Sequence, residues 1–311
     1  MPHRPMAATI LVRPNSPAAW AVAIRPKTLW IATVPVIVAA ALAWSEGAAL
    51  DPIVVALTLA GSILMQVITN LQNDVGYTVR RAETGQRVGL PRATANGWLS
   101  VPRVRGAIVV VIGAAVLVGL PLVMRGGIPI LLLGLASILA ALSYMGGPRP
   151  IAYTPLGELT VFVFFGLAAV CGSHFVFTGS VGALAWMAAA AVGSHAAAVL
   201  AVNNYRDAEH DARTGRRTFA AAYGDRVTRA TYTLLLFWPF GLSIAMAWSA
   251  SRPVLLAPLL VLPWAVQLRH RFDTTPRGDA FTAILFGTVM LEVAFGMMLA
   301  ASAVAGRLLA S

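Results

Sequence analysis

A long apolar run ends in Asn203-Asn204-Tyr205-Arg206-Asp207-Ala208-Glu209-His210-Asp211, a stretch rich in amides and carboxylates. A second apolar run ends in Asn70-Leu71-Gln72-Asn73-Asp74, and each stretch sets an Asn four residues before an Asp. Such groups are costly in hydrocarbon unless they face a cavity, so at a membrane span they indicate a functional site. The two matched stretches therefore predict a helical membrane protein whose site is assembled from both.

The composition agrees with a membrane protein. The chain has 311 residues, of which 58% are hydrophobic and 11% charged, and its mean hydropathy is +0.76. Soluble domains carry about a quarter charged residues. The net charge of +11 is compatible with a nucleic-acid partner. The arginines, however, fall in loops between apolar spans, where orientation in the membrane explains them. We therefore expect no nucleic-acid partner.

Nine stretches are apolar and long enough to cross a bilayer as helices, which takes about 20 residues. We therefore expect an all-α polytopic membrane protein with nine transmembrane helices. Residues 24–311 form a single domain in this interpretation, preceded by a flexible cytoplasmic tail at 1–23. The predicted spans are 28–45, 52–72, 106–124, 127–144, 156–178, 181–203, 229–249, 253–269 and 280–303. Gly126-Gly127 and Arg252-Pro253 predict close hairpins between the spans that they separate.

The basic residues predict the orientation of the chain. If the N-terminus is cytoplasmic, almost all basic residues lie on that side, and only Arg125, Arg252 and Arg307 fall on the other. Positive charge concentrates in cytoplasmic loops. We therefore expect a multi-pass protein of the inner membrane, embedded in the lipid bilayer, with both acidic stretches at the cytoplasmic face.

The acidic stretches carry the ligand types of a metal site. If the sixth span continues as a helix past its membrane edge, Asn203, Asp207 and Asp211 share one face. Asn70 and Asp74 repeat this spacing on the second span. Carboxylate and amide oxygens suit Mg²⁺, which usually binds through one or two carboxylates plus substrate phosphates. We therefore expect the stretches to face each other across a diphosphate. The alternative is that the acids merely pair with neighbouring arginines.

Several short motifs follow one another along the spans. They are Arg25-Pro26-Lys27-Thr28-Leu29, Asn73-Asp74-x-Gly76, Arg87-Val88-Gly89, Arg92, Tyr144-x-Gly146-Gly147-Pro148-x-Pro150, Tyr153, Leu156-Gly157-Glu158, Phe164-Phe165-Gly166, Asn203-Asn204-x-Arg206-Asp207-x-x-x-Asp211 and Gly215-Arg216-Arg217-Thr218. Together these motifs resemble the UbiA superfamily of intramembrane aromatic prenyltransferases, and within it the 1,4-dihydroxy-2-naphthoate prenyltransferase branch of menaquinone synthesis. The resemblance covers roughly residues 24–300, and its specificity comes from the order of the motifs on nine spans.

The resemblance implies a fold and a set of site residues. It implies helices around a central cavity with both acidic motifs at its cytoplasmic mouth, Mg²⁺ as cofactor, and polyprenyl diphosphate and a small aromatic acceptor as substrates. No obligatory protein partner is evident. The catalytic and metal-binding residues would be Asp74, Asp207 and Asp211, supported by Asn70, Asn73 and Asn203. The candidate phosphate contacts are Lys27, Arg87, Arg92 and Arg206.

Three further residues are candidates for the organic part of the substrates. The faces of Tyr144 and Tyr153 could stabilise an allylic cation through cation–π attraction. Glu158, at the start of the fifth span, could contact the acceptor.

One position departs from the family pattern. In the branch that this chain resembles, the first acidic motif has the pattern Asn-Asp-x-x-Asp with a further acid six residues on. This chain has Tyr77 at the second acid position and Glu83 at the later one. Tyrosine is a neutral donor near pH 7 and a poor ligand for Mg²⁺. Three interpretations stay open: weaker metal binding with Glu83 or Glu209 compensating, a different substrate, or an impaired protein.

The function also has alternatives. The same chemistry could act on 4-hydroxybenzoate, homogentisate, haem, a chlorophyllide or a secondary-metabolite phenol. In another class, the chain could be a membrane transporter, because charges inside a membrane also mark ion routes. Transporters place their sites near the bilayer midplane, however, and both acidic stretches here lie at span ends. A scaffold without activity is a third alternative, motivated by Tyr77 alone.

Overall fold

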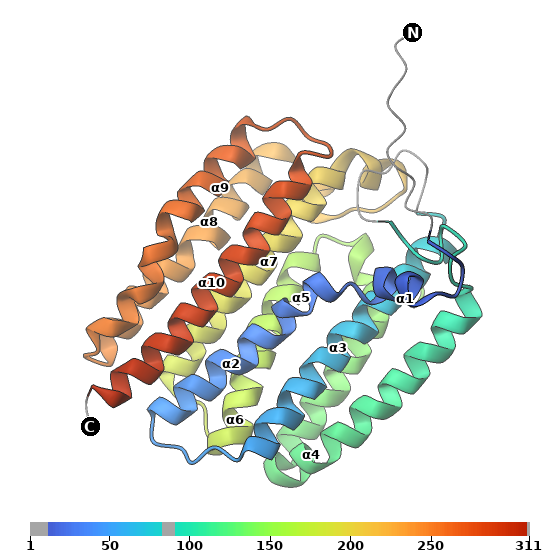
Figure 1. Cartoon of the computed structure of the whole chain (residues 1–311). Coiled ribbons are helices and arrows are strands. Elements are labelled where there is room, and N and C mark those ends of the chain that lie inside the picture. The colour runs from blue at the N-terminus through green and yellow to red at the C-terminus, as the bar shows by residue number, and fades with distance from the viewer. Residues whose placement is uncertain (1–11, 83–90, 310–311) are drawn as a thin grey trace.

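A computed structural model describes residues 12–82 and 91–309, and helices form its whole architecture (Figure 1). The α-helices are α1 (Pro17–Ile24), α2 (Trp30–Ser45), α3 (Pro52–Val79), α4 (Val101–Met145), α5 (Gly157–Val161), α6 (Gly172–Thr178), α7 (Ala183–Arg213), α8 (Phe219–Ser249), α9 (Leu262–Thr274) and α10 (Phe281–Leu308). Shorter helical segments of other types are η1 (Pro26–Thr28), η2 (Ile151–Tyr153), the π-helix η3 (Phe162–Cys171) and the 3₁₀-helix η4 (Pro253–Val261).

The described residues cross the bundle nine times, as predicted. Seven helical stretches are long and apolar enough to span a membrane, and the bent pair Pro17–Thr28 and Trp30–Ser45 forms another. The ninth crossing arises inside α4, which turns back on itself at Gly127. Gly127 has φ 66° and ψ −152°, a conformation that only glycine adopts readily. The prediction of a hairpin between 106–124 and 127–144 is therefore confirmed.

Helices α3 and α7 continue beyond the apolar spans that predicted them. α3 runs to Val79 and α7 to Arg213, whereas the predicted spans ended at residues 72 and 203. The acidic stretches thus lie on the last turns of two long helices, and one face of α7 carries Asn203, Asp207 and Asp211.

All but the last residue of helix α1 lies in the range 1–23, which the sequence assigned to a flexible tail. The side chain of Ser16 accepts a hydrogen bond from Ala19 N, which caps the helix. Ala19 and Ala23 are fully buried, and α1 packs against α3. The folded part of the chain therefore begins before residue 24. Because α1 is short, its apolar face carries little periodic signal in the sequence.

Close packing of η3 on α7 shapes the centre of the bundle. Gly166 and Gly193 face each other so closely that a Cβ on Gly166 would lie 2.5 Å from Gly193 Cα. Small residues allow membrane helices to approach and gain van der Waals contact. α7 is rich in buried alanines and lies at the core of the bundle, with α8 and α10 packed on it.

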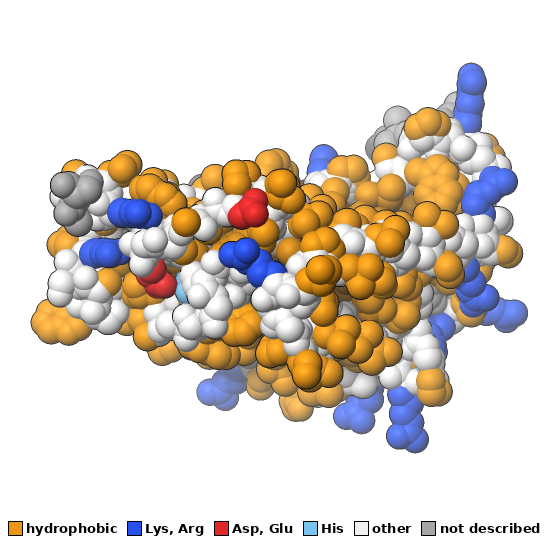
Figure 2. Space-filling view, turned by 90° about the horizontal axis from the view of Figure 1, so that it is seen from below, with side chains coloured by type: hydrophobic (Ala, Val, Ile, Leu, Met, Phe, Trp, Pro, Cys, Tyr) orange, Lys and Arg blue, Asp and Glu red, His pale blue; other side chains and the backbone are white. Residues whose placement is uncertain are grey.

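The outer surface is that of an integral membrane protein. Large apolar side chains are exposed along α4 and α8, including Val110, Met124, Ile128 and Trp248. Figure 2 shows apolar side chains over most of the visible surface, with Lys and Arg most frequent toward its right-hand edge. Such a surface fits lipid better than water.

Candidate active site

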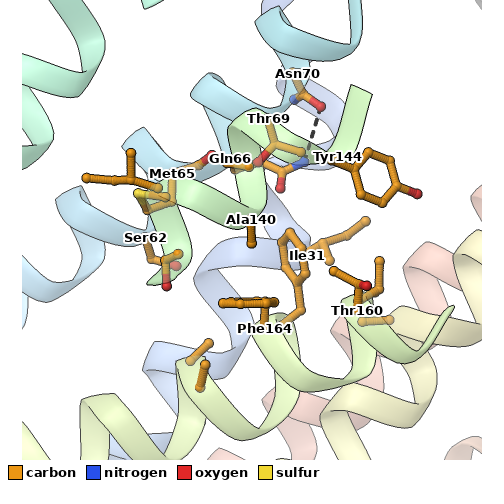
Figure 3. A pocket seen from close by; sticks show the side chains of 18 of the residues that line it. Ile31, Ser62, Met65, Gln66, Thr69, Asn70, Ala140, Tyr144, Thr160 and Phe164 are labelled. Carbon is orange, nitrogen blue, oxygen red and sulfur yellow. Dashed lines mark hydrogen bonds between the residues drawn. The ribbon is translucent and has the colours of Figure 1, made fainter. Parts of the chain in front are cut away.

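A cavity of about 500 Å³ lies between α3, α4, η3 and α7. Amides and guanidinium groups line one part of it, among them Asn73, Arg92, Asn203 and Arg206. Aliphatic and aromatic side chains from the apolar lengths of the helices line the rest. Figure 3 shows Ile31, Phe164 and Tyr144 around this space. The cavity is therefore shaped for a ligand with a charged head and an apolar body.

Amides on α3 form one side of the polar part. Gln66 Nε2 donates to Asn70 Oδ1 at 3.3 Å (Figure 3). Asn70 Nδ2 donates to Ile24 O at 2.7 Å and lies 3.1 Å from Thr28 Oγ1. Asn70 thus joins α3 to the connection between α1 and α2. Asn73 also lines the cavity, and its buried Oδ1 has no hydrogen-bond partner within residues 12–82 and 91–309.

Asp74 faces away from the cavity and anchors the segment that follows residue 90. Its side chain is fully buried and does not line the cavity. Asp74 Oδ2 accepts from Ala93 N at 2.8 Å, and Oδ1 accepts from Thr94 N at 2.8 Å and Thr94 Oγ1 at 2.6 Å. These bonds satisfy the carboxylate. They also fix the backbone next to Arg92, whose side chain lines the cavity.

On α7, Arg206 pairs with Asp207. Arg206 Nε lies 2.8 Å from Asp207 Oδ1, and Nη2 lies 3.0 Å from Oδ2. Arg206 Nη2 also donates to Asn203 Oδ1 at 2.9 Å. Arg206 and Asn203 line the cavity, whereas buried Asp207 does not. The pairing of acids with neighbouring arginines, left open as an alternative, is present in this structure.

Asp211 is held by Arg216 from the connection between α7 and α8. Arg216 Nη1 lies 2.6 Å from Asp211 Oδ1, and Thr218 Oγ1 donates to Oδ2 at 3.2 Å. Gly215, with φ 75°, ends α7 and turns the chain back so that Arg216 N donates to Asp211 O at 2.8 Å. Burial lowers the pKa of Arg216, but the nearby Tyr77 and Asp211 oxygens outweigh it and raise the pKa above its usual value. Arg216 therefore stays charged.

Of the three residues proposed to contact the organic part of the substrates, Tyr144 and Glu158 lie at the cavity and Tyr153 does not. Tyr144 lines the cavity. Glu158 is buried beside it, and its Oε1 accepts from Asn204 Nδ2 at 2.9 Å, while Oε2 has no partner in the described part of the chain. Tyr153 lies outside the cavity lining, with the Arg80 guanidinium 5.3 Å from its ring centroid.

Three other candidates lie away from the lining or outside the described residues. Lys27 Nζ lies 5.4 Å from the centroid of the Phe286 ring and does not line the cavity. Arg87 and Glu83 fall in 83–90, outside the described residues. Among the residues that the structure describes, no group of three or more His, Cys, Asp or Glu side chains is placed to hold a metal ion. In the described part of the chain, Asp74 is held by Ala93 and Thr94, Asp207 pairs with Arg206, and Asp211 pairs with Arg216.

Sequence reasoning missed several residues that line the cavity. The most informative is Arg216, which belongs to a quoted motif but was not among the predicted site residues. A basic residue after Gly215, following an acidic helix end, was the available signal. Gln66, Arg25 and Asn204 also line the cavity. Gln66 lies one helical turn before Asn70, on the same face of α3, but it is an amide and precedes the acidic stretch.

One wall of the cavity is a π-helix. Thr160, Phe164, Phe165 and Ala168 of α5 and η3 line the space opposite α3. π-helical turns widen the helix and occur often at functional sites. The widened wall places aromatic faces along the apolar part of the cavity.

The helical bundle faces lipid and encloses a cavity with an arginine-rich end and an apolar body. This combination indicates a membrane protein that binds an amphiphilic ligand. The model of the UbiA prenyltransferase family matches residues 32–290. The chain therefore belongs to this family, and it is a membrane prenyltransferase.

Named relatives agree with the family. The chain is 33% identical over 291 residues to 1,4-dihydroxy-2-naphthoate octaprenyltransferase of Escherichia coli, covering 86% of this chain and 93% of the relative. It is 30% identical to the Mycobacterium leprae protein of the same name, covering 91% and 95%.

Solved structures share the fold. A UbiA homologue from Archaeoglobus fulgidus bound to DMAPP and Mg²⁺ aligns with TM-score 0.64 and 17% identity, covering 91% of this chain and 99% of that one. An apo UbiA homologue from Aeropyrum pernix aligns with TM-score 0.67 and 16% identity, covering 87% and 96%. The predicted fold is confirmed.

Proposed function

We propose that this protein transfers a polyprenyl group from a polyprenyl diphosphate to 1,4-dihydroxy-2-naphthoate, a step of menaquinone synthesis, with Mg²⁺ as cofactor. The observation that carries the proposal is one continuous cavity whose arginine-lined part opens into an apolar part. Relatives named as 1,4-dihydroxy-2-naphthoate octaprenyltransferases support the choice of acceptor.

The diphosphate fits the polar part of the cavity. Arg92, Arg206 and Arg216 line it, and a guanidinium fork binds phosphate oxygens in pairs. The Nδ2 group of Asn73 adds a neutral donor. Together these groups stabilise the charge that develops on the diphosphate as the bond between its oxygen and C1 of the prenyl chain breaks. The prenyl tail lies along the apolar helix faces.

The oxygen donors at and behind the polar part of the cavity are of the type that a divalent cation prefers, although those in the described residues are not gathered around one point. Asn73 Oδ1 is a buried acceptor without a partner among the described residues. The carboxylates of Asp207 and Asp211 lie directly behind arginines that line the cavity. These are all oxygen donors, which hard cations prefer. We assign Asn73, Asp207 and Asp211 to the cation, with Asp74 and Glu83 as the further candidates from the sequence. A bound Mg²⁺ would neutralise the diphosphate as a leaving group.

The acceptor fits beside Tyr144. Gly157 packs closely on this side, since a Cβ there would lie 3.5 Å from Tyr144 Oη and 3.3 Å from Leu200 Cδ2. Glu158 and Asn204 supply a carboxylate and an amide for ring hydroxyl groups. The electron-rich ring forms a carbon–carbon bond to C1 of the prenyl chain. For a dihydroxynaphthoate, the family resemblance implies that the ring carboxylate leaves as carbon dioxide. The aromatic wall of η3 shields the allylic cation from water.

We place the protein in the inner membrane with the polar part of the cavity toward the cytoplasm. The distribution of arginines supports this orientation. The position of the acidic helix ends on one side of the bundle argues against a transporter, whose site lies near the midplane. Release of diphosphate that depends on the acceptor would separate the two classes.

The acceptor is tested by expressing the gene in a bacterial host that lacks its own naphthoate prenyltransferase, followed by mass spectrometry of the lipids. Restored prenylated naphthoquinone is the expected result. Purified protein is then offered equal amounts of 1,4-dihydroxy-2-naphthoate, 4-hydroxybenzoate and homogentisate with one labelled polyprenyl diphosphate. Exclusive labelling of a product from either of the other acceptors would overturn the proposed acceptor.

A further inference from the structure

Tyr77 occupies the position at which the family pattern has an acid, and the structure packs it against two arginines. Arg216 Nη1 donates to Tyr77 Oη at 2.6 Å. The guanidinium carbon of Arg92 lies 4.0 Å from the centroid of the Tyr77 ring, and that of Arg216 lies 4.9 Å away. All three side chains are 4% exposed and line the cavity.

Both arginines are positioned by groups outside the cavity. Arg92 precedes the two backbone amides that Asp74 binds, so the Asp74 carboxylate fixes the start of its side chain. Arg216 Nη1 is shared between Tyr77 Oη and Asp211 Oδ1. Its buried Nε has no hydrogen-bond partner among the described residues. A buried guanidinium donor with no partner next to a cavity is suited to an anionic ligand.

The chemistry of a phenol explains why a tyrosine suits this position. A carboxylate at residue 77 would form ion pairs with the guanidinium groups, or bind a cation, and would cancel positive charge at the cavity. A phenol accepts the Arg216 hydrogen bond and offers its ring face to a cation without adding a negative charge. Tyr77 therefore orients Arg216 through its hydroxyl and contacts Arg92 through its ring, without adding a negative charge that would compete with phosphate oxygens.

We propose that Tyr77, Arg92 and Arg216 form a phosphate-binding subsite that works without a metal ion, with Tyr77 as its positioning residue. The proposal rests on the proposed function and refines it. In this chain, guanidinium groups neutralise one phosphate of the substrate where an acid at position 77 would act through a bound cation. Tyr77 is then an adaptation of the site, which accounts for the departure from the family pattern without loss of activity.

The test measures binding of inorganic pyrophosphate to the purified full chain in detergent by calorimetry, once with EDTA and once with Mg²⁺. The wild-type protein is expected to bind in EDTA. Arg216→Gln should weaken that binding by about tenfold or more, because hydrogen bonds to charged groups contribute most when buried. Tyr77→Phe keeps the ring and loses the hydroxyl, so it should weaken binding less than Tyr77→Leu. Tyr77→Asp should abolish binding in EDTA and retain it in Mg²⁺.

A matched control exists outside the cavity. Tyr205 also lies between two arginines, with the Arg229 and Arg277 guanidinium carbons 5.2 Å and 4.1 Å from its ring centroid. None of these three lines the cavity. Arg229→Gln removes a comparable contact and should leave pyrophosphate binding unchanged. The melting temperature of every variant is measured alongside, so that a loss of binding with unchanged melting separates a role in the site from a role in the fold.

The outcomes separate this inference from the proposed function. Binding of pyrophosphate only in Mg²⁺, with Tyr77→Asp equal to wild type, would overturn the metal-independent subsite and leave the proposed function intact. Absence of binding in both buffers would overturn the assignment of this cavity to a diphosphate. Equal weakening by Arg229→Gln and Arg216→Gln would show that the effect is structural, and would also overturn the subsite.

Discussion

Arg206 and Asp207 are consecutive residues, and their side chains form a two-pronged ion pair with distances of 2.8 Å and 3.0 Å in the interior of the bundle. Arg206 contacts the cavity and Asp207 lies behind it. Removing either side chain would leave the other as an uncompensated buried charge, so the position of each side chain depends on its partner. The carboxylate can act on the ligand directly or by holding the guanidinium in place.

Asp207→Asn is therefore expected to reduce turnover by orders of magnitude and to weaken the dependence on Mg²⁺. The variant loses the charge that orients Arg206 and that a cation would use. Product formation from labelled polyprenyl diphosphate and acceptor in detergent measures the effect. Asp279→Asn, which changes an exposed loop acid, is the matched control. Product formation equal to wild type in Asp207→Asn would refute its assignment.

Asp74→Ala should destabilise the protein and also weaken pyrophosphate binding. The variant loses three hydrogen bonds to Ala93 and Thr94, at a cost of roughly 1–3 kcal/mol for each group left unpaired. Arg92 is then no longer held at the cavity. Thermal melting and calorimetry measure the two effects.

Asp51→Ala is the control for this prediction. Asp51 caps α3 through a bond of 2.8 Å to Ile53 N at the other end of the same helix. Loss of this cap should cost about 1 kcal/mol and leave binding unchanged. If Asp74→Ala lowered the melting temperature but bound pyrophosphate as wild type does, the link from Asp74 to Arg92 would be wrong.

Gly193→Ala should destabilise the bundle. The new Cβ would lie 2.7 Å from Phe162 O and 2.8 Å from Gly166 Cα, so η3 and α7 must move apart. Overpacking of this kind costs about 1–3 kcal/mol. Gly241→Ala has no atom within 4 Å of the new Cβ and should instead be neutral or stabilising, since alanine favours a helix. The melting temperatures of both variants in detergent test this prediction. Equal melting temperatures would contradict the close packing of η3 on α7 at Gly193.

Glu158→Gln should raise the KM for the acceptor while leaving pyrophosphate binding unchanged. The side chain lies beside Tyr144 and Asn204, and the polar arginines of the cavity belong to other elements. Steady-state kinetics with the acceptor varied, together with pyrophosphate calorimetry, separates the two substrates. Asp279→Asn, which changes an exposed loop acid far from the acceptor residues in the sequence, serves as control. An unchanged acceptor KM would remove Glu158 from the acceptor site.

The architecture was predictable because it depends on apolar length. Nine runs long enough to cross a bilayer gave nine crossings, and Gly126-Gly127 marked the hairpin inside α4. Hydropathy gave the apolar spans 52–72 and 181–203 but not the full helices, because α3 and α7 continue into polar residues beyond the membrane edge. α7 ends where Gly215 adopts a left-handed conformation, which hydropathy does not report.

The site was predictable in residue type but only partly in arrangement. The amides Asn73 and Asn203 and the arginines Arg92 and Arg206 line the cavity, as expected of substrate contacts. The orientation of Asp74 could not be predicted, because two of its three hydrogen bonds come from the backbone amides of residues 93 and 94, which any residue except proline supplies, and only the Thr94 hydroxyl depends on the sequence. The role of Arg216 depends on a contact with Tyr77, which lies 139 residues away in the chain. Side-chain contacts over such separations follow from the packing of helices.

The odd number of crossings in the described residues places the start of the first crossing and the end of α10 on opposite sides of the membrane. Helices α2 and α10 run in the same direction, and their far ends meet where Arg307 stacks 4.3 Å from the ring centroid of Trp44 (Figure 1). A reporter fused after Leu308 should therefore lie on the opposite side of the membrane from the arginines that line the cavity. With the orientation proposed above, a fluorescent protein that matures only in the cytoplasm would stay dark at this position, and an exported phosphatase would be active.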